Sequence, residues 1–465
     1  MMTSTETISG QIARLISGIR YGQLDERVVD RTKYLLLDFL GCALRGSLTA
    51  SFKPALKTAC SHGAGPDPVP VIGTTVHCEP SFFALATGIA AHSIELDDVV
   101  NSASLHPAVS VMPAALGIAC QQRRSGRELI EAIAAGYELT VKLGIALDPA
   151  AHYARGFHPT ATCGTFGAAA AAGKLYGLDE KQLQNAIGIA GSQAAGSMEF
   201  LADGAFTKRF HAGWSAHSGI IGASLARDGF TGPATIIEGQ FGFLKSYSSR
   251  YQPEAVLEGW GIPYEILKTS IKPHACCRYK QGPIDCICRL VEEHDLRDAD
   301  IAKITVAILD AGFALVADPL EQKQNPLSVV DAQFSMPFGA AAAVIYGDAF
   351  INRYTMKEIE KPEIQTLMKK VVCVRDADLN RNFPAQWPAW VTIDTTDGRT
   401  LEQKVTYPKG DPENPLSWDE LIGKFNALAS ALIPQSQCDE IVEIVRGIDQ
   451  AENIGSLMHT LQIPG

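Results

Sequence analysis

Apolar side chains recur every three or four positions over much of the segment 25–247, a spacing that predicts helices. Asp25 precedes one such run, and its side chain is suited to accept the first backbone N–H groups of the helix. The runs at 129–147, 164–173 and 186–196 contain several Ala and Gly residues. Because small side chains let helix axes approach closely, this segment is predicted to form a tightly packed all-helical domain.

The pattern changes near residue 262. Short runs rich in Val, Ile and Thr predict strands, and the Asp397-Gly398 pair between two of them predicts a tight hairpin turn. Helical spacing of apolar residues between the strands predicts two helices, so we expect a smaller α+β domain. Its expected elements are strands at 303–309 and 371–374, helices at 328–346 and 356–370, and a hairpin at 390–406.

The last part of the chain returns to helical spacing. Ser417 and Glu420 form the Ser-x-x-Glu pattern of a capping box at its start. Because 465 residues exceed one ordinary core, two domains are expected, and the C-terminal helices are expected to rejoin the first of them. The predicted fold is mainly α, with a large all-helical domain of residues 1–265 and 410–465 and a smaller α+β domain of residues 266–409.

Composition is that of an ordinary globular protein, with 46% hydrophobic and 20% charged residues. The net charge of −11 disfavours nucleic acid and anionic membranes as partners, because like charges repel. Residues 1–8 lack the basic and apolar regions of a signal peptide, and the 11 cysteines lack the spacing of a zinc site. We therefore expect a cytoplasmic protein with reduced thiols and no bound metal.

Two segments of the predicted helical domain place ionisable side chains in apolar surroundings. Asp97 and Asp98 follow one apolar helix, and His106 precedes the next. His158 stands in a Gly-Phe-His-Pro turn before an Ala-rich helix, whose dipole disfavours the protonated imidazole. The alternative for the aspartates is a solvated cap at a helix end, and for His158 an imidazole held by backbone groups.

Two further segments are basic. Lys208 lies in Thr-Lys-Arg-Phe-His-Ala-Gly, as either surface charge or an anchor for an anionic ligand. His211 and His217 are too widely spaced to share one helical face, so a metal pair is not expected. Residues 272–279 read Lys-Pro-His-Ala-Cys-Cys-Arg-Tyr. Cations beside thiols bind carboxylates and lower the pKa of the thiol, and the alternative is a structural loop between domains.

Common signatures of other enzyme classes do not occur. No phosphate loop or dinucleotide fingerprint follows a predicted strand, which argues against nucleotide or nicotinamide binding. No Gly-x-Ser-x-Gly elbow is present, so hydrolase chemistry has no support from the sequence.

Taken in order along the chain, these segments resemble the MmgE/PrpD family, which includes 2-methylcitrate dehydratase, cis-aconitate decarboxylase and iminodisuccinate epimerase. The resemblance rests on Glu-Leu-Asp-Asp with a following His-Pro, Gly-Phe-His-Pro, Thr-Lys-Arg-Phe-His-Ala-Gly, Gln-Phe-Gly-Phe-Leu and Lys-Pro-His-Ala-Cys-Cys-Arg-Tyr, and covers nearly the whole chain. It implies a helical domain closed by the C-terminal helices, an α+β lid domain, a homodimer, and no metal or organic cofactor. It also implies an active site in the cleft between the two domains.

The reactions of this family share a build-up of negative charge on a carbon beside a carboxylate of a small di- or tricarboxylic acid. We expect Lys208, Lys272 and Arg278 to bind carboxylates and stabilise that charge. An imidazole is expected to transfer the proton, with an aspartate orienting it. The expected catalytic residues are Asp97, Asp98, His106, His158, Lys208, Cys277 and Tyr279, and the expected substrate-binding residues are Lys272, His274 and Arg278.

Two departures from the family pattern bear on the reaction. Asp98 is followed by Val99-Val100 where dehydratases and mammalian decarboxylases have Thr-Trp, so a hydroxyl that contacts substrate is missing. Cys277 stands where mammalian decarboxylases have His, and its thiol is suited to act as a second acid/base on the opposite face of the substrate carbon. We therefore expect an isomerase of the iminodisuccinate epimerase type. The alternatives are a 2-methylcitrate-type hydro-lyase, a cis-aconitate decarboxylase and a non-enzymatic helical scaffold.

Overall fold

The computed structural model describes residues 7–463, which divide into two compact units. Unit 1 comprises Met1–Ser93, Asp97–Thr269 and Ser417–Gly465, and unit 2 comprises Ile94–Leu96 and Ser270–Leu416. The sequence pattern placed the borders at 265/266 and 409/410, close to these positions. The expectation about a signal peptide concerns residues 1–8, of which the first six lie outside the described part of the chain.

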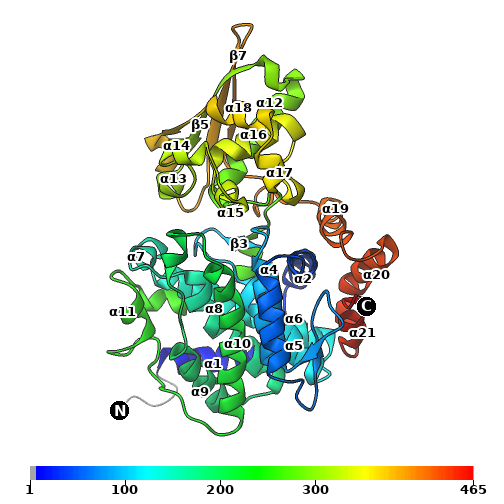
Figure 1. Cartoon of the computed structure of the whole chain (residues 1–465). Coiled ribbons are helices and arrows are strands. Elements are labelled where there is room, and N and C mark those ends of the chain that lie inside the picture. Colours follow the sequence, from blue (N-terminus) through cyan, green and yellow to red (C-terminus); the bar gives the residue numbers. More distant parts are fainter. Residues whose placement is uncertain (1–6, 464–465) are drawn as a thin grey trace. The chain divides into compact units, whose positions relative to one another are not determined.

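Unit 1 is built almost entirely of helices (Figure 1). Helix α10 packs against α8, α4 and α9, and the C-terminal helix α19 packs against α2. Its helices are α1 Ile8–Gly18, α2 Glu26–Gly46, α3 Phe52–Ser61, α4 Pro80–His92, α5 Ala108–Gln121, α6 Gly126–Ala146, α7 Pro149–Ala154, α8 Pro159–Tyr176, α9 Glu180–Gly191, α10 Thr207–Arg227, α11 Phe243–Tyr247, α19 Trp418–Ala429, α20 Gln435–Arg446 and α21 Gly455–Thr460, with short strands β1 Val69–Pro70, β2 His77–Cys78 and β3 Val99–Val100.

Local side chains account for where these helices begin. Asp25 accepts the backbone N–H of Arg27 and so starts α2, as predicted. Ser417 and Glu420 form the predicted capping box of α19. Among residues 7–463, no helix combines the length and the apolar character needed to cross a membrane.

Unit 2 contains a four-stranded sheet in the order β6-β5-β7-β8, with β6 parallel to β5 and the other pairs antiparallel (Figure 1). Helix α12 packs on β7 and β8, and α16 packs on β6. Its strands are β5 Ile301–Ile308, β6 Val371–Arg375, β7 Ala389–Thr395 and β8 Thr400–Val405, its helices are α12 Gln281–His294, α13 Asp310–Val316, α14 Leu320–Lys323, α15 Val329–Gln333, α16 Met336–Tyr346, α17 Met356–Ile359 and α18 Pro362–Lys369, and β4 Thr269–Ser270 lies at the border between the units. The mainly helical fold with a smaller α+β part is therefore confirmed.

Two predicted helices of this unit are each broken in two. The expected helix at 328–346 ends at Gln333 as α15 and restarts as α16, where Ser335 accepts the N–H of Phe338 and Pro337 occupies the first turn. The expected helix at 356–370 is α17 followed by α18, which starts at Pro362. In both cases a proline supplies no N–H to the preceding turn, so it begins a helix more readily than it continues one.

Glycine allows the central helices of unit 1 to touch. A Cβ at Gly213 of α10 would lie 2.1 Å from the carbonyl oxygen of Leu85 in α4, which belongs to the backbone and cannot move aside. We therefore expect Gly213→Ala to lower the free energy of unfolding by about 1–3 kcal/mol, measured by urea denaturation. Gly423→Ala in α19, where nothing lies within 4 Å of the new methyl group, is the control and is expected to be neutral or slightly stabilising. Equal losses in both variants would contradict this packing.

Candidate active site

Four histidines from separate segments of unit 1 form a row. His92 ends α4, His106 precedes α5, His158 immediately precedes α8, and His211 lies in the second turn of α10. Their ring centroids are 5.1 Å apart for His92 and His106, 5.9 Å for His92 and His158, and 5.4 Å for His158 and His211. The described structure thus gathers imidazoles from four segments spread over residues 92–211.

Asp97 is shared by two of these rings. Its Oδ2 lies 2.7 Å from Nδ1 of His92 and 3.3 Å from Nδ1 of His106. Nδ1 of His106 also donates to the main-chain carbonyl of Asp98. A carbonyl oxygen can only accept, so Nδ1 carries the hydrogen and Nε2 is the nitrogen of His106 that can take up or release a proton.

The Asp98 carboxyl hydrogen-bonds the first residue of α5 and a tyrosine of α6. Its Oδ1 accepts the N–H of Ala108 at 3.1 Å, and its Oδ2 accepts the hydroxyl of Tyr137 at 2.8 Å. Burial raises the pKa of the Asp98 carboxyl to about 8. Of the two neighbouring aspartates, Asp97 therefore contacts the imidazole side chains, whereas the Asp98 carboxyl holds the start of α5.

His158 and His211 are neutral imidazoles at physiological pH. Burial is the main cause that lowers the pKa of His158 well below its usual value, and electrostatic interaction with the neighbouring imidazoles and with Lys208 lowers it further. Burial and the charges of His92 and Lys208 lower the pKa of His211 to about 4. The two Nδ1 atoms are 3.3 Å apart, so one ring donates and the other accepts.

The buried state of His211 predicts a dependence of stability on pH. Between pH 6.5 and 4 the unfolded chain binds a proton on this ring that the native chain does not, so the free energy of unfolding falls as pH falls. The slope from one such group is at most about 1.4 kcal/mol per pH unit. His211→Gln should flatten the curve in this window, measured by urea unfolding at several pH values. A slope equal to that of the unsubstituted protein would contradict the assignment.

The sequence predicted catalytic roles for His158 and His106 but not for His92 or His211. His92 lies in the same motif as the aspartates, which was the available signal. His211 was considered only as a partner of His217 on its own helix, whereas its contact is with His158 of another helix. The ring of His217 instead stacks on Trp214, 5.3 Å between centroids. Spacing within one helix says nothing about such contacts between helices.

The basic segment 272–279 belongs to unit 2, where its side chains have acidic and aromatic partners. Nζ of Lys272 lies 3.9 Å from Glu95, and both side chains are buried. Nε2 of His274 lies 3.1 Å from Asp285, and Nδ1 accepts the N–H of Ala349. Partners on both nitrogens favour a structural role for this imidazole, and its expected binding of substrate stays a prediction.

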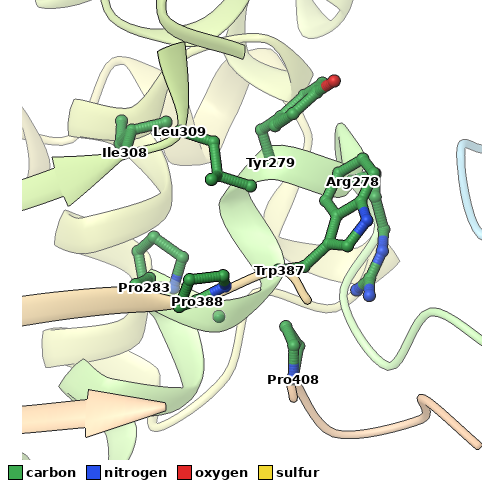
Figure 2. A pocket seen from close by; sticks show the side chains of 10 residues that line it. Arg278, Tyr279, Pro283, Ile308, Leu309, Trp387, Pro388 and Pro408 are labelled. Carbon is green, nitrogen blue, oxygen red and sulfur yellow. The ribbon is translucent and has the colours of Figure 1, made fainter. Parts of the chain in front are cut away.

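Arg278 pairs with Asp411 and lies over the ring of Trp387, 5.1 Å from its centroid. The ring of Tyr279 stacks on the same indole at 4.7 Å. Figure 2 shows the side chains of Arg278, Tyr279 and Trp387 around a small pocket of unit 2, which Leu309 and Pro283 also line. The ionisable side chains in its walls are the guanidinium of Arg278 and the phenol of Tyr279.

Cys277 is buried in the same segment, and its backbone N–H donates to the carbonyl of Gln333. Its expected role as a second acid/base, like the expected role of Tyr279 in catalysis, stays a prediction. Among the described residues, no group of three or more His, Cys, Asp and Glu side chains has an arrangement that would hold a metal ion.

Comparison with known proteins gives two matches to family models and several relatives. Residues 10–256 match the MmgE/PrpD N-terminal domain, and residues 274–450 match the MmgE/PrpD C-terminal domain. A cis-aconitate decarboxylase-like protein of Aspergillus oryzae is 28% identical, covering 98% of this chain and 97% of its own. The cis-aconitate decarboxylases of Aspergillus terreus and Homo sapiens are each 26% identical, covering 98% and 99% of this chain and 96% and 95% of theirs. The chain therefore belongs to the MmgE/PrpD family.

Proposed function

We propose that the protein is a lyase that releases carbon dioxide from cis-aconitate or a closely similar unsaturated tricarboxylate. The observation that carries the proposal is the row of imidazoles in unit 1, in which Asp97 lies against two rings. The names of the relatives point to decarboxylation as the reaction. The epimerase reaction favoured by the sequence has no support from these relatives, whereas the decarboxylase alternative does.

Decarboxylation of an allylic carboxylate requires one acid. The bond to the departing carboxylate breaks, its electron pair forms a new C=C bond, and the electrons of the old C=C bond take a proton at the far carbon. The reaction consumes one proton and yields carbon dioxide and an unsaturated dicarboxylate. We assign the proton transfer to Nε2 of His106, since Nδ1 already donates to the Asp98 carbonyl. The nearby Asp97 carboxylate stabilises the positive charge of the protonated ring.

Neutral and cationic groups are proposed to hold the substrate. His158 and His211 offer ring nitrogens that hydrogen-bond a carboxylate, and the adjacent Lys208 supplies positive charge. We further propose that Lys272 and Arg278 bind carboxylate groups of the substrate. A single proton transfer leaves Cys277 without an assigned step. Homodimer formation is part of the proposal and is tested by sedimentation velocity.

The experiment is a substrate panel followed by proton NMR in deuterated water. With cis-aconitate, the proposal expects release of carbon dioxide and a product that carries one solvent-derived deuterium. Exchange at the α-carbon of iminodisuccinate without loss of carbon dioxide would replace the proposal with an epimerase. Loss of water from 2-methylcitrate alone would replace it with a dehydratase. If no compound reacts, the helical scaffold becomes the better interpretation.

A further inference from the structure

Tyr137 lies in the buried interior of unit 1 and donates its hydroxyl to Asp98, which lies next to His106. It is on α6 and is among the largest fully buried side chains. At the adjacent Gly136, a Cβ would lie 2.5 Å from Val111 of α5 and 2.9 Å from the carbonyl oxygen of Gly167 of α8. Three helices therefore approach closely beside Tyr137, and its phenol ring is fully buried.

The phenol hydroxyl has one polar contact in the described structure, to Oδ2 of Asp98 at 2.8 Å. Burying a hydroxyl without a partner costs roughly 1–3 kcal/mol, so this contact is needed for the ring to lie where it does. Burial raises the pKa of Tyr137 well above its usual value, so the hydroxyl keeps its proton and remains a donor. Tyr137 therefore fixes the direction of the Asp98 carboxyl.

Asp98 in turn fastens both ends of the turn that carries His106. Its Oδ1 accepts the N–H of Ala108, and its carbonyl accepts Nδ1–H of His106. The N–H of His106 donates to Oγ1 of Thr160 at 3.1 Å, which attaches the same turn to the first turn of α8. The turn is closed by a bridge between Val100 and Leu105. Asp98 thus links Tyr137 on one side to Ala108 and His106 on the other.

We propose that Tyr137 is a positioning residue, which acts through Asp98 to hold the turn so that His106 keeps its Nδ1-protonated form and its Nε2 in place. The inference rests on the proposed function, because it concerns the group to which the proton transfer is assigned. Removing the hydroxyl leaves Oδ2 of a buried carboxyl without its donor, and the carboxyl can then turn away from the N–H of Ala108. The turn loosens, but no group that contacts substrate is lost.

The test is Tyr137→Phe, which keeps the ring and removes only the hydroxyl. We expect kcat on cis-aconitate to fall on the order of ten- to a hundredfold, since small misplacements of a catalytic group have effects of this size. KM should stay within about twofold. A loss of kcat at nearly constant KM indicates that an interaction made only in the transition state has been weakened. The matched control is Tyr176→Phe. Tyr176 is the last residue of α8, and its half-buried hydroxyl lies 3.1 Å from Oγ of Ser224 in α10. Removing this hydroxyl should leave kcat unchanged.

A second readout does not need turnover. In protein labelled with nitrogen-15 in its histidines, the His106 signals are identified by their loss in His106→Gln. They should show hydrogen on Nδ1 in the unsubstituted protein and in Tyr176→Phe, and a mixture of both ring forms in Tyr137→Phe. This measurement separates the two hypotheses: if cis-aconitate is not a substrate but the ring signals change as expected, the positioning role stands and only the proposed function fails.

Asp98→Ala provides a further variant in case Tyr137→Phe does not fold. It removes both carboxyl oxygens and should produce the same mixture of ring forms, and the double variant should lose no more activity than the more damaging single variant, because both act on one contact. Unchanged kcat together with unchanged His106 signals in Tyr137→Phe would overturn the inference. So would fully additive losses in the double variant.

Discussion

Replacing His106 with glutamine is expected to lower kcat on cis-aconitate by about a thousandfold, while KM changes little. General acid catalysis by a positioned side chain contributes about 10²–10⁴ to a rate, and glutamine keeps a polar group of similar length but has no ionisable proton. The effect is measured by steady-state release of carbon dioxide. Deuterium incorporation at the new C–H bond should slow to the same extent as carbon dioxide release, because both depend on the same transfer.

The matched control is His77→Gln in β2. His77 is exposed, and its Nδ1 lies 3.3 Å from the carbonyl oxygen of Thr75. We expect this variant to keep the kcat of the unsubstituted protein. If His106→Gln also keeps full activity, the proton comes from another group, and His92 would be the next residue to test because it shares Asp97.

Replacing Lys424 with methionine is expected to lower the free energy of unfolding by about 3–5 kcal/mol. Nζ of Lys424 lies 2.6 Å from Oδ1 of Asp38, and the two side chains are 5% and 1% exposed. Methionine fills the space of the lysine stem but leaves the Asp38 carboxylate buried without its cation, and breaking a buried pair in this way costs about that much. The pair joins α19 to α2, so the variant should also loosen the C-terminal helices, measured by urea unfolding and by hydrogen exchange.

Two comparisons make this prediction specific. Adding Asp38→Leu to Lys424→Met removes the unpaired buried carboxylate and should restore much of the lost free energy of unfolding. Arg381→Met breaks an exposed pair, in which the side chains of Arg381 and Asp378 are 73% and 77% exposed, and should cost less than about 1 kcal/mol. A loss in Lys424→Met no larger than that of Arg381→Met would show that the buried pair does not stabilise the fold.

The fold followed from the sequence wherever a structural feature depends on neighbouring residues. The caps at Asp25 and Ser417 act on N–H groups two or three positions ahead, and the Asp397-Gly398 turn joins adjacent strands, with Gly398 at a φ of 89°. The errors lay at the two predicted helices of unit 2 that are broken at 334–335 and 360–361. The helical spacing of apolar residues continues across each break, which is why one helix was predicted. The proline in the first turn of each second helix ends the preceding hydrogen-bond pattern despite that spacing.

The sequence predicted the candidate site less completely than it predicted the fold. Motif order selected Asp97, Asp98, His106 and His158, and the family assignment was correct. The reaction expected from Val99-Val100 and Cys277 was an epimerase, which the relatives do not support. A missing hydroxyl or an added thiol changes chemistry only through its distance from substrate, and that distance cannot be read from residue type.

Periodicity, caps and turn residues were enough to establish a mainly helical chain with a smaller α+β part and the return of the last helices, because these signals act over a few residues. The folded arrangement alone revealed that Asp97 faces two imidazoles while Asp98 faces Tyr137. It also brought His211 next to His158. The physical reason is that hydrogen bonds and burial depend on separations of a few ångströms between segments far apart in the chain, and these separations arise only when the helices pack.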